Sequence, residues 1–144
     1  MATTPLTDTR RAPVDGAPLG RALQGLAVGR LALGTAALLA PRKLGRIFRL
    51  EMGPEVAYMT QIYGGRAIAM GVGYLTAPRA ERPRWQRLGL AVDVSDTIAA
   101  TGHLRRRDLP PRAAPALAAL TGSYAAVGAA RAIGDLVAHH RRAA

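Results

Sequence analysis

The sequence predicts an all-α protein, built as a bundle of four transmembrane helices, and three observations support this. Apolar residues gather in four blocks of similar length, with most charged residues between them. No stretch alternates apolar and polar residues as a half-buried strand does. Long stretches inside the blocks have no polar face, which each helix of a water-soluble bundle needs. The length of 144 residues suits a single domain.

Composition narrows the possible functions before any motif is considered. The chain has no cysteine, which excludes disulfides, thiolate metal sites and cysteine nucleophiles. Its net charge is +11, from 20 Lys and Arg against 9 Asp and Glu. Such an excess favours contact with anionic lipid head groups or with nucleic acid.

The chain begins with a predicted disordered tail, residues 1–18, which is rich in proline and has no apolar run. "TRR" at Thr9–Arg11 is similar to a twin-arginine export signal, but the apolar residues that should follow are missing. The first block, Leu19–Ala40, stops at Pro41. A helix of this length spans roughly 30 Å, about one bilayer core. It is too long for a cleaved signal peptide, and Arg30 interrupts it.

A short basic segment, residues 41–49, follows the first block. Leu44, Ile47 and Phe48 fall on one helical face, and the basic residues fall largely elsewhere. The pattern is typical of a short amphipathic helix lying in the head-group layer of a membrane, and a basic connecting loop is the alternative.

Three further blocks complete the predicted membrane domain, residues 19–138. Tyr58 and Tyr74 lie near the ends of the second block, where tyrosines suit a membrane interface, and Trp85 begins the third. A basic tail, residues 139–144, follows the last block. The three blocks are Val56–Ala77, Trp85–Leu104 and Ala113–Ala138.

A soluble alanine-rich bundle and a mixed arrangement, with the third block only partly inserted, are the alternative folds. The last block has no charged residue from Ala113 to Ala130, so it offers no solvated face there. Rows of small residues also favour close helix packing in lipid. These rows are Gly25 and Gly29; Gly65, Ala69 and Gly73; Gly122 and Ala126; and Gly128 and Ala132.

Orientation is only weakly specified. Basic residues outside the blocks divide almost evenly between the two sides, so the positive-inside rule finds little asymmetry. Four spans place both termini on one side. We expect that side to be the cytoplasmic face of the inner membrane, because a polar tail without a signal most simply stays there.

Four charged residues lie near the middle of three blocks: Arg30, Arg66, Asp93 and Asp96. A charge at the bilayer centre costs about 3 kcal/mol on insertion scales, so these side chains should face inward and pair. The two aspartates share one helical stripe with small residues. The stripe consists of Gly89, Asp93, Asp96, Ala100 and His103.

The cluster allows two interpretations. It is either an ion-pair network that fixes how the helices pack, or a polar cavity that binds a ligand or conducts a proton. In the cavity, Asp93 or Asp96 would be the candidate acid or base. Arg131 and Asp135 form a secondary i,i+4 pair. We expect no cofactor and no metal site, because no metal-ligand spacing occurs.

Three stretches, "YGGRAIAMGVGYL", "GLAVDVSDTIAATGHLRRRDLP" and the Ala/Gly-rich last block, resemble a family of small actinobacterial membrane proteins. The family is catalogued as a domain of unknown function. The likeness covers roughly residues 20–137 and implies a four-helix inner-membrane protein. It implies that Arg66, Asp93 and Asp96 recur as polar features, and it implies no activity.

The sequence therefore favours a non-enzymatic binding or assembly component of the membrane. Its expected partners are a bilayer with anionic head groups, a second copy of the chain or another membrane protein, and a lipid-like ligand. One alternative is a membrane-embedded enzyme or carrier for a lipid-like or isoprenoid-like substrate. The other is a soluble nucleic-acid-binding protein, which is disfavoured because the basic residues sit at block ends and not along one helix.

Overall fold

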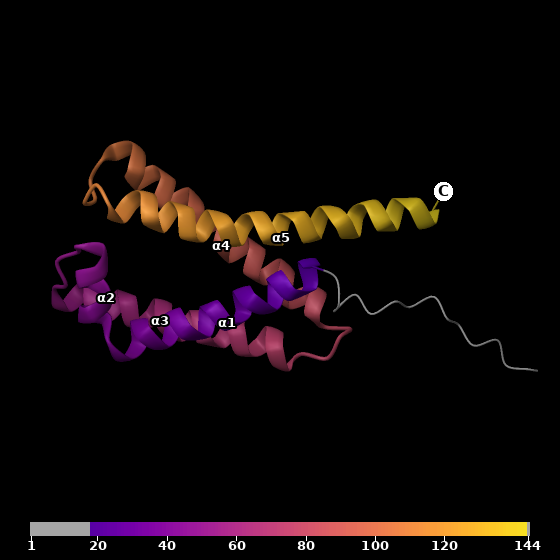
Figure 1. Ribbon diagram of the computed structural model, residues 1–144, viewed down its shortest axis with the longest axis horizontal. Coiled ribbons are helices and arrows are strands. Elements are labelled where there is room, and N and C mark those ends of the chain that lie inside the picture. The colour runs from indigo at the N-terminus through magenta and orange to yellow at the C-terminus, as the bar shows by residue number, and fades with distance from the viewer. Residues whose placement is uncertain (1–17, 144) are drawn as a thin grey trace, which may run out of the picture.

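The computed structural model describes residues 18–143, and within that range the chain is entirely helical apart from its connections. The all-α prediction is confirmed. The expected tail lies outside the described residues, except for Pro18, which opens the first helix. The helices are α1 (Pro18–Leu39), α2 (Pro41–Phe48), α3 (Pro54–Thr76), α4 (Arg82–Arg106) and α5 (Ala113–Ala143) (Figure 1).

Prolines and two unusual arginines mark the helix boundaries. α2 and α3 begin at Pro41 and Pro54, where the missing backbone N–H costs nothing. Arg49 and Arg107 end α2 and α4 with φ of 55° and 56°, a left-handed conformation that glycine adopts more easily. The basic segment is thus a helix, and the expected basic tail continues α5 as far as Ala143.

The helices form two hairpins. α1 packs along α3, and α4 packs along α5, while contacts between the two pairs are far sparser. Figure 1 shows α5 above the α1/α3 pair, and α4 crosses obliquely from the level of that pair to the upper side of α5. α2 lies at one end of the molecule, opposite the end that holds the start of α1 and the C-terminus (Figure 1).

Glycine lets α1 and α3 approach within backbone contact. A Cβ atom on Gly34 would lie 2.8 Å from the carbonyl oxygen of Gly64, and one on Gly71 would lie 2.8 Å from that of Ala27. The small-residue rows noted in the sequence do not form this seam: Gly25 and Gly65 have no neighbour within 4 Å of such an atom, while Gly29 and Gly73 face Tyr124 and Trp85. Small residues occur on several faces of both helices, so their spacing alone could not identify the face in contact.

The interior consists of small residues, and the large apolar side chains point outward. Alanine supplies nearly all of the buried apolar residues in residues 18–143, with Leu23 the exception, and no large side chain there is fully buried. Ile47 and Ile98 are 75% and 68% exposed. This arrangement reverses the usual distribution in a water-soluble protein, where large apolar residues are the most buried.

Two described helices are long and apolar enough to cross a membrane, not the four expected: Pro18–Leu39, and the Ala113–Ala138 portion of α5. In the most apolar 18-residue stretch of each helix, only 22% and 11% of the residues are buried. A core helix of a soluble protein would be mostly buried. α3 is less apolar because Gln61 and several tyrosines and glycines accompany Arg66, and Asp93, Asp96 and several arginines interrupt α4.

Candidate functional site: a polar cluster between two hairpins

One stripe of α4 faces the interior, as predicted from its spacing. Gly89, Asp93 and Ala100 are buried, Asp96 is half-buried, and Ile98 on the opposite side is exposed. Helical residues three and four apart share a face, so the four inward positions follow from the spacing. The stripe brings both carboxylates to the boundary between the hairpins.

Arg30 of α1 pairs with Asp93 of α4. Arg30 Nη2 lies 2.5 Å from Asp93 Oδ2, and the two side chains are only 14% and 9% exposed. Gly89, one turn before Asp93, makes room for the guanidinium. A Cβ atom at position 89 would lie 2.8 Å from Arg30 Nη1.

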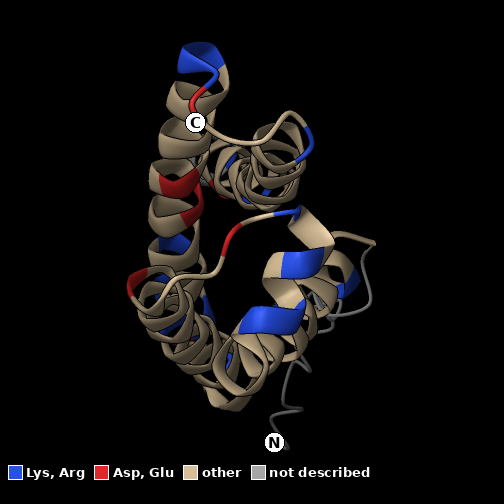
Figure 2. Cartoon of the chain, turned by 90° about the vertical axis from the view of Figure 1, so that its left-hand side faces the viewer, with Lys and Arg blue, Asp and Glu red and all other residues tan. Residues whose placement is uncertain are grey.

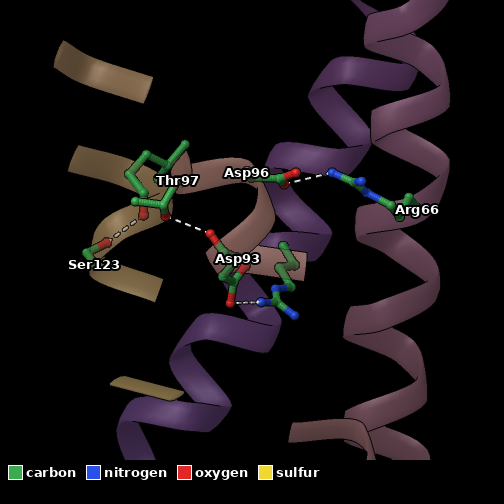
Figure 3. A network of polar contacts seen from close by, with 7 residues as sticks. Arg66, Asp93, Asp96, Thr97 and Ser123 are labelled. Carbon is green, nitrogen blue, oxygen red and sulfur yellow. Dashed lines mark hydrogen bonds and ion pairs between the residues drawn. The ribbon is translucent and has the colours of Figure 1, made fainter. Parts of the chain in front are cut away.

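Arg66 of α3 pairs with Asp96, one turn further along α4. Arg66 Nη2 lies 2.7 Å from Asp96 Oδ2, and these side chains are 45% and 24% exposed. Figure 3 shows the two carboxylates pointing away from α4 toward cations on two different helices. The four charges predicted to share one depth therefore form two separate pairs, one enclosed and one more open.

Two tyrosines complete the cluster, and the sequence analysis gave neither a role there. Tyr124 of α5 and Tyr63 of α3 lie against the guanidiniums of Arg30 and Arg66, with ring centroids 5.4 and 5.5 Å from the Cζ atoms. At these distances a ring face attracts a cation. Tyr124 is the one aromatic residue of the last block, so no periodic pattern of aromatic residues pointed to it.

Hydroxyl groups near the cluster bond to helix backbone. Thr97 Oγ1 donates to the carbonyl oxygen of Asp93 at 2.6 Å, and Ser123 Oγ donates to that of Leu120 at 2.7 Å (Figure 3). Among the described residues, every buried side-chain nitrogen and oxygen has a hydrogen-bond partner. Each carboxylate accepts a hydrogen bond from one arginine through its Oδ2 atom, and no buried side-chain polar atom among these residues lacks a partner.

Two small voids flank the Arg30–Asp93 pair. Their volumes are about 30 and 20 Å³, and Arg30, Asp93 and Tyr124 line both. Each has room for about one water molecule. A lipid-like substrate therefore has no space beside Asp93, so the geometry favours the ion-pair network over a ligand cavity.

Both ion pairs join the two hairpins. The cations belong to the α1/α3 hairpin and the anions to the α4/α5 hairpin. The stacking of Arg30 on Tyr124 also crosses this boundary. Close backbone approach between the hairpins is sparse, so these polar contacts are among the side-chain contacts that join one hairpin to the other.

Arg131 and Asp135 pair within α5, away from the cluster. Arg131 Nη2 lies 3.0 Å from Asp135 Oδ1, and Asp135 is 49% exposed. An exposed i,i+4 pair stabilises a helix by about 0.3–0.5 kcal/mol. This pair supports α5 locally and takes no part in joining the hairpins.

A second cluster of polar side chains lies at the C-terminal end of α4. His103 Nδ1 lies 2.8 Å from Asp108 Oδ1, and Arg106 Nε donates to Asp108 Oδ2 at 2.9 Å. The hydrogen bond from Arg106, followed by that from His103, lowers the pKa of the Asp108 carboxyl below its ordinary value. No group of three or more His, Asp and Glu in the described part of the chain is placed to hold a metal ion.

Comparisons with protein-family models, with curated proteins and with solved structures find no significant match to this chain. The function is therefore argued from the geometry above.

Proposed function

We propose that the chain is a small integral membrane protein that acts as a non-enzymatic binding or assembly component. The main support for this proposal is the distribution of side chains. Large apolar residues lie on the outside, while two ion pairs, one enclosed and one more open, cross from one hairpin to the other. Intramembrane charges that pair in this way suit a role in fixing the arrangement of helices.

The two hairpins offer a route to four spans although α3 and α4 are less apolar. Each hairpin joins one helix that is long and apolar enough to span a membrane, α1 or α5, to one that is less apolar. The Arg66–Asp96 and Arg30–Asp93 pairs neutralise the deepest charges of α3 and α4 inside the bundle. Paired charges that face a bundle interior are the form in which ionisable residues occur in membranes.

An even number of spans, four or two, agrees with the positions of the outer ends of α1 and α5. α1 begins and α5 ends at the same end of the molecule (Figure 1). We place the protein in the inner membrane, as the resemblance to the small actinobacterial family implies, and both termini on its cytoplasmic side, as expected above.

Cysteine labelling tests this topology, because the natural chain has no cysteine of its own. Single cysteines replace Ala80, between α3 and α4, and Pro111, between α4 and α5; both positions are exposed. With four spans, an impermeant maleimide labels one of them in spheroplasts and the other only in inverted vesicles. With only α1 and α5 spanning, both positions are labelled from the same side.

Extraction tests the membrane location itself. We expect the protein to stay in the membrane pellet at alkaline pH and to be released by detergent. Release by alkali alone would contradict the proposal. It would favour a soluble or peripheral helical protein, such as the nucleic-acid-binding alternative.

A further inference from the structure

An apolar pocket of about 300 Å³ lies under α2. It is lined by Leu44 and Phe48 of α2, and by residues of the three neighbouring helices that include Leu33, Met59 and Leu117. No lining residue is charged. The volume is ten times that of the larger void beside the ion pairs, and it reaches the range of small-ligand sites.

The chemistry of this pocket suits a hydrocarbon chain. Its polar side chains are Thr60 and Tyr63, and the Thr60 hydroxyl already donates to the carbonyl oxygen of Val56 at 2.7 Å. Met52 and Met59 also line it, and flexible methionines adapt to ligands of irregular shape. Tyr63 lines both this pocket and the void beside Asp96.

The opposite face of α2 is cationic. Arg42, Lys43 and Arg46 are exposed and line a surface hollow of about 640 Å³. No carboxylate among residues 18–143 forms an ion pair with any of the three. Figure 2 views the molecule from this end and shows basic residues (blue) on its near side.

One short helix therefore separates an apolar pocket from a cationic hollow. Ile47 lies at the edge between the two faces, since it follows Lys43 by four residues and Leu44 by three, and it is 75% exposed. Its exposed side chain adds apolar surface between the cations and the apolar face of α2. A ligand with an anionic head and an apolar chain matches both sides of α2 at once.

We infer that α2 is the binding site for one anionic phospholipid, whose phosphate contacts Arg42, Lys43 and Arg46 and whose acyl chain enters the apolar pocket. This inference rests on the proposed membrane location. A free phosphate would use only the cations, and a neutral lipid only the pocket. The two together give selectivity for anionic lipid beyond that of a general basic surface.

Native mass spectrometry of the detergent-purified full chain tests the inference. Dioleoyl phosphatidylglycerol is titrated against dioleoyl phosphatidylcholine, which has the same chains but no net charge. We expect one phosphatidylglycerol to bind at least tenfold more tightly. The variant carrying Arg42→Gln, Lys43→Gln and Arg46→Gln should bind it about a hundredfold more weakly, at roughly 1 kcal/mol per cation.

A matched control removes the same charge from the same end of the molecule. Arg105→Gln, Arg107→Gln and Arg112→Gln together should weaken binding less than about threefold, because screening confines such effects to nearby charges. Equal losses in the two triple variants would overturn the inference in favour of a general charge effect. Circular dichroism of each variant shows whether its helices are intact.

A separate variant tests the part of the proposed site that binds the acyl chain. Leu117→Trp fills the pocket without changing charge, and we expect at least tenfold weaker phosphatidylglycerol binding. Leu136→Trp, at a 60% exposed position of the same helix, is the control. Unchanged binding by Leu117→Trp would overturn the placement of the chain.

The comparison of the two lipids on the natural protein does not depend on any variant folding, and equal binding of both would refute the site. Extraction by alkali would instead refute the membrane location, so the two failures are distinguishable.

Discussion

Replacing Asp93 by asparagine should destabilise the bundle far more than the same change at Asp96. The substitution keeps the shape of the side chain but leaves Arg30 charged among residues that expose only 14% of it. Removing one partner of a buried ion pair costs about 3–5 kcal/mol. The Arg66–Asp96 pair is 45% and 24% exposed at the surface of the bundle, so the long Arg66 side chain can turn toward water or head groups when its partner is removed, and Asp96→Asn should cost about 1 kcal/mol or less.

The assay is reversible unfolding in mixed micelles, with helix content followed as the fraction of denaturing detergent rises. A double-mutant cycle with Arg30→Gln and Asp93→Asn isolates the coupling of the pair, which we expect to exceed that of the Arg66–Asp96 cycle by about 2 kcal/mol. Equal costs at the two aspartates, or less than about 0.5 kcal/mol at Asp93, would refute the argument that burial separates the two pairs.

Three further predictions concern other parts of the chain. Gly34→Ala should lower stability by about 1–3 kcal/mol in the same assay, because its Cβ atom would lie 2.8 Å from a carbonyl oxygen of α3. The control Gly25→Ala, with no neighbour within 4 Å, should be neutral or stabilising. Arg49→Gly should relieve the left-handed backbone at the end of α2 by about 1 kcal/mol and slow amide exchange there by about fivefold; faster exchange would contradict this. Arg106→Gln should raise the pKa of Asp108 toward its ordinary value in a carboxyl NMR titration, and no change would show that the hydrogen bond is not formed.

The sign of the Asp108 effect on stability follows from its lowered pKa. A carboxyl group with a lowered pKa in the folded state binds its proton more weakly there than in the unfolded chain. Its contribution is therefore present above its ordinary pKa and is lost as the pH falls through the lowered value. Arg106→Gln should make stability less sensitive to pH in this acidic range.

Much of the architecture could be predicted from the sequence, because the signals were local. Prolines mark the starts of α2 and α3, and the spacing of Gly89, Asp93 and Ala100 identifies the inward face of α4. The segment after Leu39 has the amphipathic pattern that α2 shows.

The partners within the cluster could not be predicted in the same way. Arg30 and Arg66 lie at similar depths, so sequence position cannot show which cation meets Asp93. That choice depends on how the hairpins are arranged and on the space left by Gly89. Tyr124 was missed because a single aromatic residue in an Ala/Gly helix has no periodic pattern.

The division of the cluster between the hairpins has a consequence for biosynthesis. The first hairpin to leave the ribosome holds both central cations, Arg30 and Arg66, and the second holds both central anions. In a bilayer, neither half could neutralise its deepest charges alone. The charges of the nascent α1/α3 hairpin would stay unpaired until α4 emerged. Asp93 and Asp96 would then pair with them, and this one step would complete insertion and folding of the chain.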